Sequence, residues 1–123
     1  TIVARSPLKA MALLSHFGLK GDVVPMNAPL PPARLLVNSS PLGMAGQDPL
    51  DLDLSGQPAD TVVYDIVYAP LETALLKAAR DRDMETVDGL EMLVGQAAIA
   101  FELFFGKAPP DEDGELRDRL VRA

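Results

Sequence analysis

Short runs of β-branched and apolar residues alternate along this chain with stretches whose apolar residues recur at helical spacing. The clearest run covers residues 61–68, Thr-Val-Val-Tyr-Asp-Ile-Val-Tyr, and is mostly apolar. That composition is typical of a central strand in a parallel sheet, which is buried on both faces. The alternation predicts βαβ units and therefore an α/β fold, doubly wound, with a mostly parallel sheet.

The same patterning predicts five strands and four helices along the chain. The strands are expected at residues 1–4, 22–25, 35–38, 61–68 and 84–87, the third of them buried. The helices are expected at residues 7–17, 70–81 and 90–105, with a last one after a cap at Asp111 or Asp113. Glycines 18 and 106 should end the first and third helices. The apolar faces should comprise Ala10, Leu13, Leu14 and Phe17 on the first helix and Leu116 and Leu120 on the last.

Composition limits the class of protein and its partners. The 123 residues suit one domain, and 48% of them are hydrophobic, which is enough for a core. The net charge of −7 disfavours nucleic acid, because an acidic surface repels phosphate backbones. No apolar run approaches the roughly 20 residues that span a bilayer, so a membrane partner is not expected and a cytoplasmic location is. With no cysteine and no metal-ligand spacing around the single histidine, no metal site is expected.

The N-terminal residues bear on domain organisation. A β-branched strand opens on Thr1, without an initiator methionine. We therefore expect residues 1–123 to be a portion of one domain that belongs to a longer protein.

Basic and hydroxyl side chains gather where the first strand meets the first helix. Arg5 and Ser6 lie between the two elements, and Lys9 lies in the first turn of the helix. A helix N-terminus after a parallel strand suits a phosphate, because its N–H groups are unpaired and its dipole end is positive. An acidic residue there would accept the ribose hydroxyls of NAD, whereas a guanidinium, a hydroxyl and an ammonium suit the extra phosphate of NADP. The alternative is that Arg5 is a solvated charge and Ser6 only a helix cap.

The predicted helix at residues 90–105 is apolar on almost every face, which indicates burial on more than one side. Gln96 lies in its middle, four residues from Met92 and so on the same face. A buried amide needs a partner, either a polyol ligand or a neighbouring backbone carbonyl. Tyr68 ends the strongest strand at the edge where α/β proteins bind ligands, or simply has its hydroxyl in solvent.

Three other polar residues are expected to be structural. Asp65 lies inside an apolar strand and should accept hydrogen bonds from backbone N–H groups. Asp88, before Gly89, should be a turn residue, and His16 a surface residue near the end of its helix.

Four segments, in order, resemble motifs of the shikimate dehydrogenase family and together cover nearly the whole chain. They correspond to the family patterns Asn-Arg-Thr-x-x-Arg/Lys-Ala, Asn-x-Thr/Ser-Pro-x-Gly-Met, Tyr-Asp-x-x-Tyr-x-Pro-x-x-Thr and Asp-Gly-x-x-Met-Leu-x-x-Gln-Ala. In this chain they are Val3–Ala10 with Arg5-Ser6 and Lys9, Asn38–Met44, Tyr64–Thr73 and Asp88–Ala97. Ala4, Ala69 and Glu91 depart from the family, which usually has Asn, Asn and Gly there.

The resemblance implies an NADP-binding Rossmann-type domain and assigns roles to its residues. Arg5, Ser6 and Lys9 should hold the 2′-phosphate, and Ser39, Ser40 and Pro41 should lie along the cofactor. The residues expected on the nicotinamide side are Ile66, Gly89 and Met92. Tyr68 and Gln96 should reach the substrate, shikimate or 3-dehydroshikimate. No catalytic residue is expected here, because the family's Lys/Asp pair belongs to its N-terminal domain.

The implied activity is the NADP-dependent reduction of 3-dehydroshikimate, a step of aromatic amino-acid biosynthesis. The glycine-rich loop and the first, central strand of the sheet should precede Thr1, and the helices from about residue 90 should pack on the N-terminal catalytic domain. A homodimer is compatible with this arrangement. An NAD-using quinate/shikimate dehydrogenase and a non-catalytic nucleotide-binding module are the alternatives.

Overall fold

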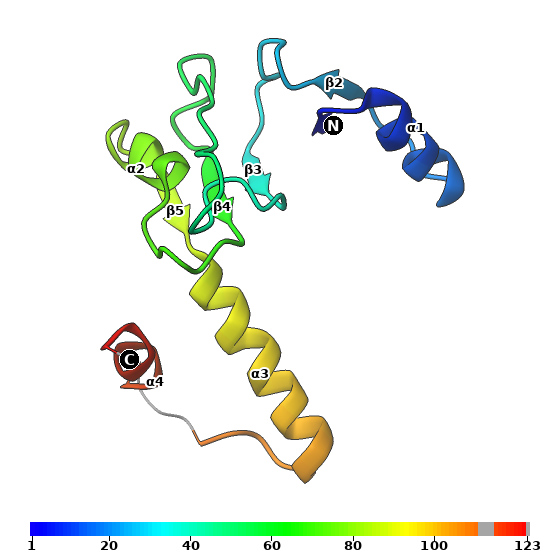
Figure 1. The fold of residues 1–123 in the computed structure, drawn as a ribbon. Helices are drawn as coiled ribbons and strands as arrows, with labels where there is room; N and C mark the ends of the chain where they lie inside the picture. The colour runs from blue at the N-terminus through cyan, green and yellow to red at the C-terminus, as the bar shows by residue number, and fades with distance from the viewer. Residues whose placement is uncertain (111–114, 123) are drawn as a thin grey trace. The chain divides into compact units, whose positions relative to one another are not determined.

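The computed structural model describes residues 1–110 and 115–122 of the chain. Helices and strands are interspersed along the chain, and every strand pair is parallel, so the α/β prediction is confirmed (Figure 1). The strands are β1 (Ile2–Ala4), β2 (Val23–Pro25), β3 (Leu35–Asn38), β4 (Val62–Asp65) and β5 (Glu85–Val87). The helices are α1 (Pro7–His16), α2 (Ala74–Arg80), α3 (Gly89–Phe105) and α4 (Glu115–Arg122). Two compact parts result: Thr1–Ala33 with Asp53–Pro58, and Arg34–Leu52 with the residues from Ala59 onward.

In the first part, α1 packs on the parallel pair β1–β2. Ser6 is the N-cap of α1, and Gly18 follows its last turn with φ 61°, so both predicted helix ends are confirmed. The predicted apolar face is wrong in extent. Ala10 is buried, but Leu13 and Phe17 are exposed, because two strands of three residues cover only one side of the helix.

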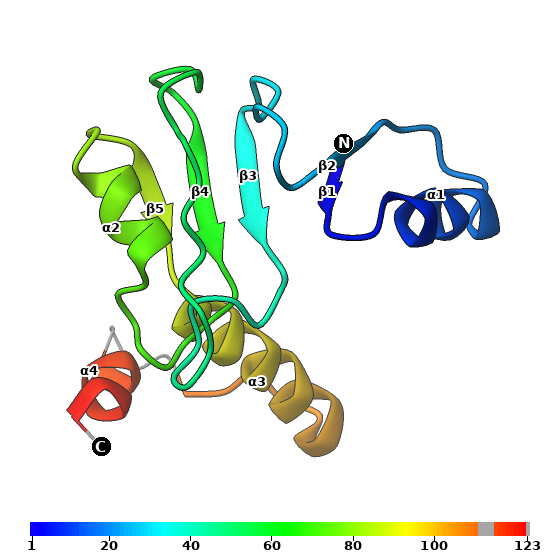
Figure 2. The same cartoon turned by 45° about the horizontal axis from the view of Figure 1, so that its top comes forward.

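In the second part, β3, β4 and β5 form a parallel sheet in that order, with α2 against β4 and β5 (Figure 2). The core lies between this sheet and α2, where Val63, Leu75, Leu76 and Ala79 are buried. β1 and β3 belong to different sheets and share no hydrogen bonds as neighbours.

Two strand predictions need correction. The sequence predicted a buried strand at residues 35–38, yet Leu35 is 57% exposed, because alternate side chains of β3 point to opposite faces and only one face is covered. The strand predicted at residues 61–68 ends at Asp65. The strand ends there for a local reason: the Asp65 side chain accepts a hydrogen bond from the Val67 backbone N–H, and the chain turns.

The helices also differ from expectation in their bounds and burial. α2 begins at Ala74 instead of at Pro70, because Thr73 is its N-cap and the Thr73 side chain accepts from the Leu76 backbone N–H. α3 was expected to be buried on several sides, but only Gly89 and Leu90 are buried. Its far half is open, with Phe104 84% exposed, because no other described element covers it within this part of the chain.

Two further observations concern the C-terminal region and membranes. The caps proposed at Asp111 and Asp113 lie outside the described residues, while α4 is present and keeps Leu116 and Leu120 partly exposed. Gly106 ends α3 with φ 65°, as predicted. Within residues 1–110 and 115–122, no helix has the length and hydropathy needed to cross a bilayer.

Candidate functional site

A pocket of about 250 Å³ lies just beyond the carboxyl ends of β3 and β4. The chain leaves β3 at Asn38 and β4 at Asp65, and the segments that follow form the walls. The lining residues are Ser39, Ser40, Pro41, Met44, Ile66, Val67, Tyr68 and Ala69. Ligands of open α/β sheets bind at this edge. The pocket therefore brings together five residues singled out from the sequence: Ser39, Ser40, Pro41, Ile66 and Tyr68.

Buried polar side chains hold the two strand ends together. Asn38 and Asp65 are opposite one another in the parallel register, and Asn38 Nδ2 donates to Asp65 Oδ1 over 2.9 Å. Asn38 Nδ2 also donates to the Leu42 carbonyl, at 3.0 Å. Asp65 has no exposed surface, and its Oδ1 accepts from the Val67 backbone N–H at 3.0 Å. The predicted structural role of Asp65 is confirmed.

The same network extends into both walls of the pocket. Asn38 Oδ1 accepts from the backbone N–H and the hydroxyl of Ser40, at 3.0 and 2.8 Å. Asp65 Oδ2 accepts from the Thr73 hydroxyl at 2.7 Å, and Thr73 Oγ1 in turn accepts from the Leu76 backbone N–H and caps α2. We call Asn38, Ser40, Asp65 and Thr73 the polar hub. It fixes both wall segments and the start of α2 relative to one another.

The start of α3 touches the back of the pocket wall. The Gly89 backbone N–H donates to the Val67 carbonyl at 3.2 Å. A Cβ added to Gly89 would collide with the Ile66 carbonyl oxygen and with the carbonyl carbon of Val67, so the close approach requires glycine. Met92, one turn further on, is half-buried, and Gln96 is exposed. Neither Met92 nor Gln96 lines the pocket. The expected burial of the Gln96 amide is wrong, because the residue is exposed.

Asp88 is a helix cap rather than only a turn residue. Its carboxylate accepts from the Leu90 and Glu91 backbone N–H groups, at 3.0 and 3.4 Å. Arg117 of α4 forms a salt bridge with it, joining Nη2 and Oδ2 at 2.5 Å. The hydrogen bond from Arg117 is the main cause that lowers the pKa of Asp88, against burial, which raises it. The same hydrogen bond raises the pKa of Arg117.

Sequence reasoning overlooked Asn38 as the partner of Asp65 and Arg117 as the partner of Asp88. A usable signal existed for Asn38, since two apolar strands that pair in parallel both end on a polar residue. Arg117 gave no such signal, because 29 residues separate it from Asp88.

Arg5, Ser6 and Lys9 lie in the first part of the chain, at the junction of β1 and α1. All three are exposed, and the Ser6 side chain makes no capping hydrogen bond although Ser6 is the N-cap. Among the described residues, none of the salt bridges includes Arg5 or Lys9. The structure therefore keeps a guanidinium, a hydroxyl and an ammonium open to solvent at a helix N-terminus.

Comparison with known proteins identifies the family. The family model described as Shikimate 5'-dehydrogenase C-terminal domain matches residues 89–113. Over 121 residues the chain is 69% identical to a protein of Sphingopyxis alaskensis named shikimate dehydrogenase (NADP(+)). The matched region covers 98% of this chain and 44% of that protein. The chain belongs to the shikimate dehydrogenase family, matching its C-terminal part.

Solved structures of the family extend the likeness to the fold. A shikimate 5-dehydrogenase of Thermus thermophilus in complex with NADP(H) and shikimate superposes with a TM-score of 0.75 at 34% identity, over 98% of this chain and 44% of that one. A quinate dehydrogenase of Corynebacterium glutamicum in complex with NAD gives 0.73 at 32% identity, over 98% and 45%. The Rossmann-like fold is thereby confirmed, and the chain spans less than half the length of these relatives.

The three later family motifs meet around the pocket and the polar hub. Asn38–Met44 and Tyr64–Thr73 supply the walls and the hub, and Asp88-Gly89 packs behind the second wall. Glu91, a departure from the family, is turned toward Arg117, with its Oε1 2.8 Å from Arg117 Nη1. Its charge is therefore paired.

Proposed function

We propose that this chain is the cofactor-binding part of an NADP-dependent shikimate dehydrogenase, which reduces 3-dehydroshikimate to shikimate. The observation that carries the proposal is the pocket at the carboxyl ends of β3 and β4, built from two family motifs and braced by the polar hub. The 69% identity with the Sphingopyxis alaskensis enzyme supports the same activity.

The residues of the chain fit a dinucleotide. The pocket walls offer the Ser39 and Ser40 segment and the apolar side chain of Ile66, and Gly89 permits a close backbone approach directly behind them. We assign Ser39, Ser40 and Pro41 to the body of the cofactor and Ile66, Gly89 and Met92 to its nicotinamide end. When bound, NADPH supplies the hydride, while the protein supplies position and charge.

Cofactor choice rests on the β1–α1 junction. Arg5, Ser6 and Lys9 would hold the 2′-phosphate through charge-assisted hydrogen bonds at the positive end of α1. All three residues are exposed, and the Ser6 hydroxyl makes no capping hydrogen bond although Ser6 is the N-cap of α1. Both observations support this role. The similarity to a quinate dehydrogenase in complex with NAD favours the alternative, an NAD-using quinate/shikimate dehydrogenase. Against it, no acidic side chain follows β1 to accept the ribose hydroxyls of NAD.

The substrate side needs the rest of the enzyme. We assign Tyr68, which lines the pocket, and Gln96, further along α3, to shikimate or 3-dehydroshikimate, with the acid/base pair supplied by an N-terminal catalytic domain. The exposed apolar residues of α3 support this arrangement, because such a surface requires a cover. They are Ile99, Leu103, Phe104 and Phe105. Residues 1–123 would then form one portion of a single NADP-binding domain. A homodimer would leave these assignments unchanged.

The proposal is tested in an assembled enzyme, in which this chain is joined to the N-terminal part of the Sphingopyxis alaskensis relative. The assembled enzyme should oxidise shikimate with NADP. Arg5→Ala should raise KM for NADP at least tenfold, about 1.4 kcal/mol, and leave KM for NAD nearly unchanged, since only NADP carries the extra phosphate. Lys20→Ala, which removes an exposed cation from the same part of the chain, is the matched control. Equal losses for both cofactors would refute the assignment of Arg5, and a non-catalytic module would show no turnover at all.

A further inference from the structure

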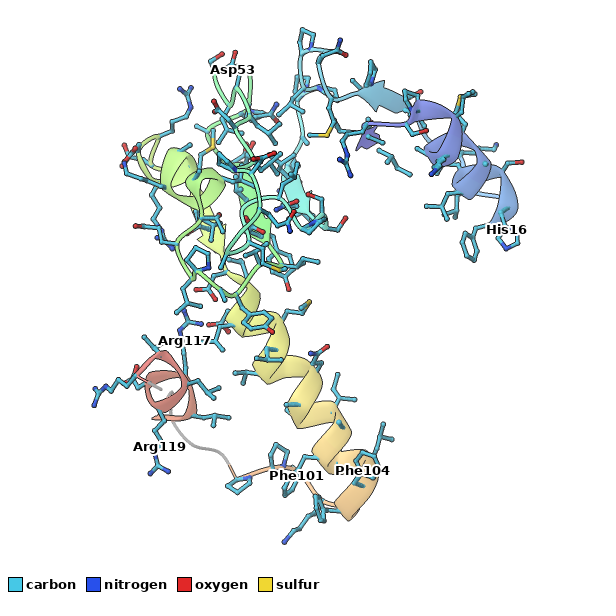
Figure 3. The ribbon with its side chains drawn as sticks, in the orientation of Figure 1. His16, Asp53, Phe101, Phe104, Arg117 and Arg119 are labelled. Carbon is cyan, nitrogen blue, oxygen red and sulfur yellow. The ribbon has the colours of Figure 1, made fainter. Side chains whose placement is uncertain are left out.

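Arg117 joins two carboxylates at the first turn of α3. Its Nη1 donates to Asp88 Oδ1 at 3.2 Å and its Nη2 donates to Asp88 Oδ2 at 2.5 Å. We call this bidentate contact the fork. Nη1 also donates to Glu91 Oε1 at 2.8 Å. Figure 3 shows the Arg117 side chain reaching from α4 toward the beginning of α3, whereas Arg119 extends to the other side of α4. A planar guanidinium can make this fork, and an ammonium cannot.

The two ends of this contact differ in burial. The Asp88 side chain is 9% exposed, and the Arg117 side chain 34%. Asp88 already accepts two backbone N–H groups as the cap of α3, so the fork fixes a carboxylate that in turn fixes the helix start. Glu91 is 56% exposed, and its contribution is correspondingly weaker because solvent screens the pair.

The helix start is in direct contact with the pocket wall. Gly89 follows Asp88 and is hydrogen-bonded to Val67, and it packs against the Ile66 carbonyl without room for a Cβ. Ile66 and Val67 line the pocket. Any shift of Asp88 therefore moves Gly89 relative to the wall on which the reacting end of a ligand would rest.

We infer that Arg117 is a positioning residue for the pocket: through its fork on Asp88 it holds the first turn of α3, and with it Gly89, against Ile66 and Val67. The inference rests on the proposed function for its kinetic consequence. Arg117 does not line the pocket, so it acts through Gly89 on the alignment of the nicotinamide end. We expect binding of the 2′-phosphate, assigned to Arg5, Ser6 and Lys9, to be unaffected.

The test compares Arg117→Ala, Arg117→Lys and the control Arg122→Ala in the assembled enzyme, at a temperature where all three are folded. Arg122 is an exposed residue of the same helix. Arg117→Ala should lower kcat for shikimate oxidation roughly tenfold, because a small misplacement of reacting groups slows the reaction strongly. The kcat of Arg117→Lys should lie between those of Arg117→Ala and the unmutated enzyme. Inhibition by 2′,5′-ADP, a probe for the 2′-phosphate site alone, should match the unmutated enzyme in every variant.

A role confined to anchoring α4 would lower the melting temperature and leave kcat equal to that of Arg122→Ala, which would overturn the inference. If Arg117→Ala fails to fold, Arg117→Lys decides in the same way. Amide hydrogen exchange at residues 66–69 and 89–92 gives a second reading that needs no activity, and it should accelerate in the Arg117 variants only. An inactive but folded unmutated enzyme would refute the proposed function, and the exchange rates would then support or overturn the positioning role by themselves.

Discussion

The pocket lies at the carboxyl ends of β3 and β4, and the β1–α1 junction lies at the carboxyl end of β1, yet polar side chains are arranged in opposite ways in these two regions. At the pocket, Asn38 and Asp65 are buried and satisfied by one another and by the backbone. At the junction, Arg5 and Lys9 are exposed, and Ser6 makes no capping bond. The first region is organised before any ligand arrives, so its residues should matter for stability. The second should matter only when a ligand binds.

The sharpest way to break this comparison is Asp65→Ala. It should lower the free energy of unfolding by about 3–5 kcal/mol, because the buried Val67 N–H and the O–H of the buried Thr73 hydroxyl would both lose their acceptor. Urea unfolding of the assembled enzyme measures the loss. Asp51→Ala, which removes an exposed carboxylate from the same part of the chain, and Arg5→Ala should both stay within about 0.5 kcal/mol of the unmutated enzyme. If Asp65→Ala unfolded with the same free energy as the unmutated enzyme, the polar hub would not be needed for stability.

Gly89→Ala tests the contact between α3 and the wall. The added methyl group would collide with the Ile66 carbonyl, and we expect a loss of about 1–3 kcal/mol together with a fall in kcat. Gly95→Ala on the same helix is the matched control, since nothing lies within 4 Å of its added Cβ. It should stabilise the enzyme by about 0.5–1 kcal/mol through helix propensity. Equal effects of the two substitutions would contradict the close approach at Gly89.

Gln96→Ala extends the comparison to an exposed residue of α3. Stability should be unchanged, because the amide is exposed and buries no hydrogen bond. KM for shikimate should rise roughly tenfold, about 1.4 kcal/mol, while KM for NADP stays within twofold. Steady-state kinetics of the assembled enzyme provide the measurement. A lowered melting temperature with unchanged kinetics would instead assign Gln96 to packing against the rest of the enzyme.

The smallest expected effect is on pH dependence. The pKa of Asp88 is lowered in the folded chain, first by the hydrogen bond from Arg117, so the contact adds stability above the ordinary aspartate pKa of 3.8. That stability is lost as the pH falls through the lowered value. The stability difference between the unmutated enzyme and Arg117→Ala should be less than about 1 kcal/mol, because the Arg117 side chain is 34% exposed and solvent screens the pair. This difference should be constant from pH 5 to 8 and shrink below about pH 4. A difference that grows in acid would have the wrong sign.

Much of the fold was predictable from local pattern, and the failures have physical causes. The strand–helix order and the helix ends at Ser6, Gly18 and Gly106 follow from short-range chemistry that the sequence displays directly. Burial was overestimated for α1 and α3, because apolar periodicity says that a face will be covered but not by which chain. The pocket residues Ser39 to Pro41 were predicted from the family motif, whereas Arg117 depends on a contact between distant helices that no local pattern encodes.

The polar hub also implies an order of assembly when the chain folds. Its contacts from Asp65 to Val67 and Thr73 close loops of two and eight residues, whereas the bond between Asn38 and Asp65 spans 27. Short loops close first, because the entropy lost on closure grows with loop length. The turn after β4 and the start of α2 should therefore form as a local nucleus, onto which β3 docks later. The cavity would be completed in that docking step, so slow folding of β3 would delay ligand binding even in a chain that already has most of its helices.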